Sequence, residues 1–98
     1  LKAGRPEEAS QQAEENAARF QEDPWILAKS AELLWRVGRH ERAEELFRRA
    51  LDRAANARYL RETVLERLLA LLEEMGKTEV ARQLAEAEEK RRGRPQKV

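Results

Sequence analysis

The stretch that decides the fold is AELLWRVGRHERAEELFRRAL, residues 31–51. Apolar and small residues recur in it every three or four positions, the spacing that places side chains on one face of an α-helix. Gly38 interrupts this pattern, and glycine is common just past the end of a helix. Two antiparallel helices joined by a short turn, a helical hairpin, are therefore expected on either side of Gly38.

The same helical spacing continues on both sides of this hairpin. Asp23 and Pro24 mark a helix start, because aspartate caps a helix and proline suits its first position. No stretch alternates in the manner of a strand rich in Val, Ile and Thr. The sequence therefore predicts an all-α fold of about five helices, with the ranges 6–20, 24–37, 40–54, 57–75 and 78–90.

Composition supports one small helical domain. The chain has 98 residues, of which 40% are charged and 5% aromatic, a balance typical of helices with charged exposed faces. It has no cysteine, which excludes a disulfide framework and is compatible with a cytoplasmic location. Its longest apolar run, Leu68 to Leu72, is far shorter than the roughly 20 residues that span a bilayer. We therefore expect a cytoplasmic protein without a membrane partner.

Glycines divide the chain into repeats. Gly38 follows Gly4 by 34 residues, and Gly76 follows Gly38 by 38. A period of 34 is that of tetratricopeptide repeats. With Ala31, Leu34, Gly38, Ala43, Phe47, Ala50 and Leu51, the middle repeat resembles the consensus of this family. The resemblance covers about residues 4–90 and implies helical hairpins stacked as a short right-handed solenoid, whereas a generic amphipathic bundle is the alternative.

The outer repeats depart from the family pattern. In the third repeat, Ala85 stands where the middle repeat has Phe47, and Glu88 stands where it has Ala50. Four surplus residues before Gly76 predict an extra turn at the start of the fourth helix. The first repeat comprises only its second helix. We expect its apolar face to be covered by a longer array of repeats or by a second copy in a homodimer.

The family resemblance also implies a function. In tetratricopeptide domains the first helix of each hairpin lines a concave groove that binds an extended peptide or a helix, which predicts a protein–protein interaction or scaffold module. The matching positions here are Trp25, Ala28, Glu32, Trp35 and Arg36 in the middle repeat, and Thr63, Glu66, Ala70, Glu73 and Glu74 in the third.

Two questions about this groove stay open in the sequence. Trp25 and Trp35 are either binding anchors, since tryptophan is enriched at interface hot spots, or residues that pack in the core or against the first helix. The Lys, Asn and Arg with which some family members grip a C-terminal carboxylate are absent, because the matching positions carry Ala28, Glu32, Glu66 and Ala70. The acidic third repeat instead favours a basic or mixed-charge partner.

The last nine residues carry five basic and no acidic groups, so we separate a basic tail, residues 91–98, from a domain at residues 1–90. Within it, Arg92, Gly93, Arg94 and Pro95 resemble the core of an AT-hook, which lies in the minor groove of A·T-rich DNA. A DNA-associated adaptor is therefore the alternative function. Otherwise Lys90–Arg92 stabilise the end of the fifth helix, with Gly93 ending it and a solvated tail beyond. Another acidic partner or RNA is a third possibility.

Catalysis is not expected. His40 is the only histidine, and it lies beside charged residues at the start of the third helix. No spacing of His, Cys and carboxylates suggests a metal site, and no strand is present to hold a phosphate-binding loop. The paired glutamates alternate with arginines at helical spacing, as on solvated helix faces. We therefore expect neither enzymatic activity nor a cofactor.

Overall fold

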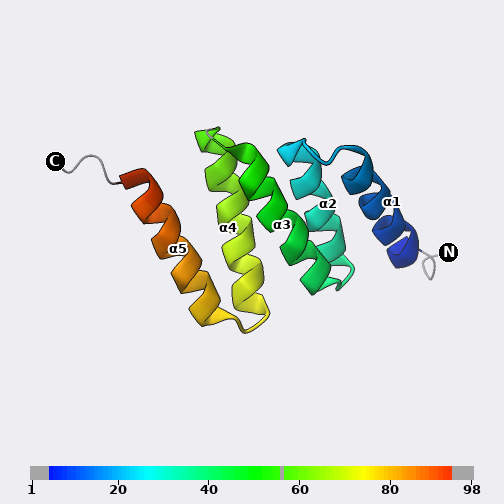
Figure 1. The fold of residues 1–98 in the computed structure, drawn as a ribbon. Coiled ribbons are helices and arrows are strands. Elements are labelled where there is room, and N and C mark those ends of the chain that lie inside the picture. Colours follow the sequence, from blue (N-terminus) through cyan, green and yellow to red (C-terminus); the bar gives the residue numbers. More distant parts are fainter. Residues whose placement is uncertain (1–4, 56, 94–98) are drawn as a thin grey trace.

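The computed structural model describes residues 5–55 and 57–93, and its regular structure is entirely helical (Figure 1). The five helices are α1 (Arg5–Arg19), α2 (Pro24–Arg36), α3 (His40–Ala54), α4 (Arg58–Glu74) and α5 (Thr78–Gly93). The all-α prediction is confirmed, and four helices begin and end within one residue of the predicted positions. Helix α5 extends to Gly93, the end expected if Lys90–Arg92 belong to the fifth helix.

Local chemistry explains where α2 begins. The Asp23 carboxylate accepts hydrogen bonds from the backbone N–H groups of Trp25 (3.0 Å) and Ile26 (3.3 Å), while Pro24 occupies the first turn. These contacts satisfy two donors that have no partner within the helix.

Glycine ends α2 and α4 in the same way. Gly38 and Gly76 have φ angles of 85° and 81°, a left-handed conformation that glycine adopts without steric cost. The N–H of Gly38 donates to Trp35 O (2.9 Å), and that of Arg39 to Leu34 O (2.8 Å). Equivalent bonds follow Gly76, where its own N–H reaches Glu73 O (3.0 Å) and the next reaches Leu72 O (2.8 Å). This pair of bonds is the Schellman motif, and it turns α2 into α3 and α4 into α5.

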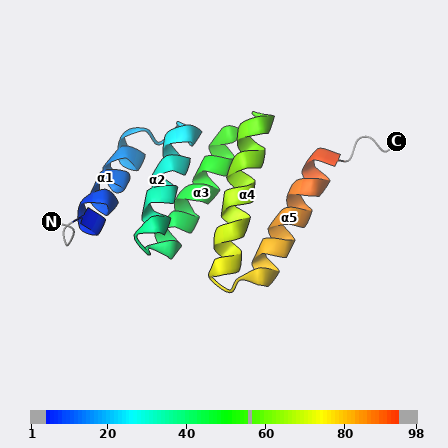
Figure 2. The ribbon, with the colours of Figure 1, turned by 180° about the vertical axis from the view of Figure 1, so that it is seen from behind.

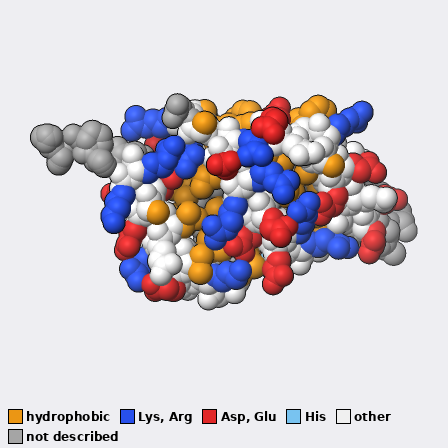
Figure 3. Space-filling model, viewed as in Figure 1, with side chains coloured by type: hydrophobic (Ala, Val, Ile, Leu, Met, Phe, Trp, Pro, Cys, Tyr) orange, Lys and Arg blue, Asp and Glu red, His pale blue; other side chains and the backbone are white. Residues whose placement is uncertain are grey.

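The helices lie side by side in a row, with α1 and α5 at opposite ends (Figures 1 and 2). Each helix packs against the next one along the chain, and α2 also contacts α4. Charged side chains of both signs are interspersed with apolar patches on the face seen in Figure 3. No helix in the described part of the chain is long and apolar enough to cross a bilayer.

The core combines leucines, Phe47 and small residues. Its largest fully buried side chains are Phe47, Leu27, Leu34, Leu46, Leu68, Leu71, Leu72 and Val64. Ala31, Ala43 and Ala50 are also fully buried, so the helices of the first hairpin can approach closely.

Helix α1 buries two alanines and exposes most of its described polar side chains. Ala13 and Ala17 are buried, and α1 packs against α2. Its exposed side chains include Glu8, Gln11, Gln12 and Glu15, which line a polar surface hollow. The apolar face of this helix is therefore packed against α2, and its described side chains show no second, unpaired apolar face. Phe20, which follows α1, is the one large apolar group exposed at its end.

A buried ion pair accounts for one departure from the repeat pattern. Arg61 on α4 donates to both carboxylate oxygens of Glu88 on α5, from Nε at 2.6 Å and from Nη2 at 3.0 Å. Its Nη1 donates to Leu51 O at 2.7 Å, at the end of α3. Glu88, which stands where the middle repeat has a small alanine, therefore joins α5 to α4 through this arginine.

Candidate partner-binding face of α2 and α4

On α2, none of the five predicted groove residues is fully buried, although Ala28 and Trp35 pack against the edge of the core. The buried residues of this helix are Leu27, Ser30, Ala31 and Leu34. Trp25 and Arg36 are exposed, and Ala28, Glu32 and Trp35 are partly buried. Their positions are three, four and seven residues apart, which places them along one stripe of the helix.

On α4, four of the five predicted residues are exposed: Glu66, Ala70, Glu73 and Glu74. Thr63 is partly buried, and its hydroxyl donates to Tyr59 O at 3.0 Å. Together with the α2 residues these positions form what we call the α2/α4 face. It comprises Trp25, Ala28, Lys29, Glu32, Trp35 and Arg36 of α2, and Tyr59, Thr63, Glu66, Arg67, Ala70, Glu73 and Glu74 of α4.

Two side-chain bridges join the helices across this face. Trp35 Nε1 donates to Glu74 Oε1 at 3.1 Å, and Arg67 Nε donates to Glu32. Between them is an open pocket of ≈ 400 Å³ lined by Glu32, Trp35, Arg36, Arg67 and Glu74. The structure thus brings together four predicted residues and adds Arg67.

Trp35 belongs to both the core and the face. Its ring meets Phe47 edge-on, with centroids 6.1 Å apart, while the Arg67 guanidinium lies 5.9 Å from the indole centroid. Packing against Phe47 and the hydrogen bond to Glu74 hold this ring in one orientation. Trp25 differs, because it is 52% exposed. Part of the Trp35 ring is therefore packed in the core, whereas Trp25 is not a core residue.

Outside the Arg67–Glu32 bridge, the charged side chains of this face are basic on α2 and acidic on α4. No described residue forms an ion pair with Lys29 or Arg36 on α2. The same is true of Glu73 on α4. The hydrogen bond to Glu32 raises the pKa of Arg67 above its usual range, with a smaller contribution from the charge of Glu66. Side chains free to pair with a partner are thus basic along α2 and acidic along α4.

Sequence analysis missed Tyr59 and Arg67. Arg67 lies four residues after Thr63 and seven before Glu74, so helical spacing could have found it. Tyr59 lies four residues before Thr63, in the first turn of α4. The surplus of four residues before Gly76 was the available signal for this extra turn.

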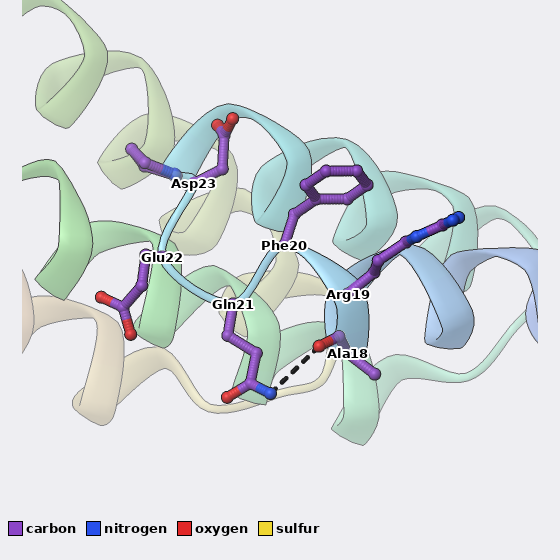
Figure 4. A pocket seen from close by; sticks show the side chains of 7 residues that line it. Ala18, Arg19, Phe20, Gln21, Glu22 and Asp23 are labelled. Carbon is purple, nitrogen blue, oxygen red and sulfur yellow. Dashed lines mark hydrogen bonds between the residues drawn. The ribbon is translucent and has the colours of Figure 1, made fainter.

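A second hollow, of ≈ 690 Å³, lies at the connection between α1 and α2 (Figure 4). Its lining comes from one continuous segment, residues 18–24, in which Gln21 Nε2 donates to Ala18 O at 3.0 Å. Arg19 lies 5.8 Å from the centroid of the Phe20 ring. Because this hollow draws on a single segment, it brings no distant residues together, and the α2/α4 face is the stronger candidate.

The AT-hook-like segment cannot be placed in the same way. The backbone of α5 includes Arg92 and Gly93, but their side chains, together with Arg94 and Pro95, lie outside the described residues. In residues 5–55 and 57–93, no three His, Asp or Glu side chains gather so that they could hold a metal ion. The chain matches no family model, no curated protein and no solved structure in the comparisons. Its function is therefore inferred from the fold and from the α2/α4 face.

Proposed function

We propose that the chain is a tetratricopeptide-like protein–protein interaction module that binds a partner segment on the α2/α4 face. The observation that carries this proposal is the pair of bridges, Trp35–Glu74 and Arg67–Glu32, which fix an aromatic ring among charged groups. A rigid aromatic side chain costs little entropy on binding, and tryptophan and arginine are enriched where binding energy is concentrated.

The helix arrangement supports the tetratricopeptide-like part of the proposal. Two hairpins, α2/α3 and α4/α5, turn through the same glycine geometry at Gly38 and Gly76. Contact between α2 and α4 makes the first helices of the two hairpins neighbours, as a right-handed stack of such hairpins requires. Their outward stripes then form one continuous surface, which is a suitable docking area for a peptide.

A photo-crosslinking experiment tests the proposal. A photoreactive residue is placed at Ala70, which is exposed on the α2/α4 face, and in a matched variant at Ala87, which is exposed on α5. Both replace an exposed helical alanine, so both variants should fold. We expect one partner to be crosslinked in cells from Ala70 and not from Ala87. Equal labelling from both positions, or labelling from Ala87 alone, would refute a partner site on this face.

A further inference from the structure

The two bridges fix how α2 and α4 are aligned. They join residues separated by 35 positions (Glu32 and Arg67) and by 39 positions (Trp35 and Glu74). Both helices begin at the same end of the molecule and run in the same direction (Figures 1 and 2). Trp25, in the first turn of α2, therefore lies level with the first turns of α4.

Two exposed aromatic side chains, one on each helix, lie at this end of the face. Trp25 is 52% exposed and Tyr59 is 75% exposed. Aromatic rings of this size bury substantial area when they enter an interface. Tyr59 is carried by the extra turn that makes α4 longer, at 17 residues, than α2, at 13. One ring on each side of the seam could enclose an apolar side chain of a partner.

The same alignment pairs opposite charges across the rest of the face. Lys29 lies level with the turn of α4 that carries Glu66, and Arg36 lies level with the turn that carries Glu73. All four side chains are exposed. A partner between them therefore meets positive charge on its α2 side and negative charge on its α4 side.

Resting on the proposed function, we infer that the α2/α4 face binds an extended peptide of alternating charge, with an apolar residue held between Trp25 and Tyr59. Successive side chains of an extended chain point to opposite sides. Acidic side chains would then face Lys29 and Arg36, and the basic side chains between them would face Glu66 and Glu73.

Geometry favours an extended chain over a helix. The bridges from Trp35 and Arg67 span the seam at the level of the side chains, and the pocket of ≈ 400 Å³ between them has room for no more than about one turn of a helix about 10 Å across. Lys29 and Arg36 are two helical turns apart, about 10 Å, which corresponds to about three residues of extended chain. Side chains that point to the same side of an extended chain are two or four residues apart, so the spacing differs from three by one residue. Long, flexible lysine, arginine and glutamate side chains can span this difference.

Selection from a random peptide library displayed on phage tests this inference. The selected peptides are synthesised, and their affinities are measured for the intact chain and for three variants. Trp25→Ala and Tyr59→Ala remove the two rings, while Phe20→Ala removes an aromatic side chain that is 42% exposed outside the face. Thermal unfolding of each variant verifies that the fold is retained.

We expect selected peptides to carry acidic and basic residues in alternation beside an apolar one. Trp25→Ala and Tyr59→Ala should each weaken binding about tenfold, as loss of an aromatic anchor does, and Phe20→Ala should leave it unchanged. Peptides whose acidic and basic residues do not alternate, or peptides insensitive to Trp25→Ala and Tyr59→Ala, would overturn the inference and leave the proposed function standing. Selection of no peptide, together with no crosslinking at Ala70, would overturn both.

Discussion

At the scale of single residues, the contact between Arg61 and Glu88 is the least predictable feature of the chain. Sequence comparison between the repeats shows only that a charged residue replaces an alanine. The structure gives the compensation, because 13% of the Arg61 side chain and 9% of the Glu88 side chain are exposed and the two form a bidentate pair. A partner 27 positions away, on another helix, cannot be recognised from local spacing.

Removing one partner of this pair should lower the free energy of unfolding more than removing both partners. Glu88→Ala leaves a buried guanidinium unpaired, and we expect it to lower the free energy of unfolding by about 3 kcal/mol. The double variant Arg61→Met, Glu88→Ala replaces the pair with apolar groups and should recover much of that loss. Urea unfolding of both single variants and the double variant measures the coupling. Strictly additive effects would show that the pair contributes no interaction energy.

Glu44 gives the chain a predictable response to acid. Burial raises the pKa of its carboxyl group, but hydrogen bonds from Lys77 (2.9 Å) and Arg48 (3.0 Å) outweigh it, so the pKa lies below the ordinary 4.5. A lowered pKa in the folded state means that the ionised group stabilises the fold above pH 4.5. This stabilisation is lost as the pH falls from there through the lower, folded value.

A neutral replacement should remove this contribution. At neutral pH we expect Glu44→Gln to be less stable than the wild type, and the difference to shrink on acidification below pH 4.5. Chemical unfolding at several pH values provides the measurement. Glu41→Gln is the matched control, since Glu41 is exposed and forms no ion pair within the described part of the chain, and its replacement should change stability little. A pH-independent difference for Glu44→Gln would contradict the assignment.

At the scale of helices, local signals placed most boundaries. Asp23 and Pro24 determine where α2 begins, and Gly38 and Gly76 determine where α2 and α4 end. All of these act through contacts within a few residues along the chain, so the sequence pattern predicts them. The end of α3 is different, because Ala55 closes it with φ 48° and ψ −110°, a conformation that side chains disfavour. Alanine is not a residue type typical of such a turn, so the residue at position 55 does not predict it.

Ala55→Gly should therefore stabilise the protein. Removal of the side chain relieves the left-handed strain, and we expect a gain of about 1 kcal/mol after part of it is offset by the greater flexibility of glycine in the unfolded chain. Ala18→Gly is the control, since this exposed alanine lies within α1 and its replacement should cost up to about 1 kcal/mol. Thermal unfolding compares them. A loss of stability in both variants would show that Ala55 is unstrained.

At the scale of the whole molecule, the resemblance to tetratricopeptide repeats supplied the two stripes that we place on one face of α2 and α4. Helical periodicity alone gives only which residues of each helix point away from the core. It could not predict the bridges between the stripes. Trp35–Glu74 and Arg67–Glu32 depend on how far α2 and α4 are shifted along one another, which the spacing within either helix does not give. The opposite charges along the two sides follow only once this alignment is known.

Charge reversal on this face tests the central claim most directly. Glu66, Glu73 and Glu74 are replaced together by lysine, and the affinity for the partner crosslinked at Ala70 is measured by titration. The control variant reverses Glu8, Glu15 and Glu89, which are exposed on α1 and α5, and so changes the net charge equally. We predict that reversal on the α2/α4 face weakens binding at least about tenfold while the control has little effect. Unchanged affinity, or equal weakening by both variants, would contradict a partner site on α2 and α4.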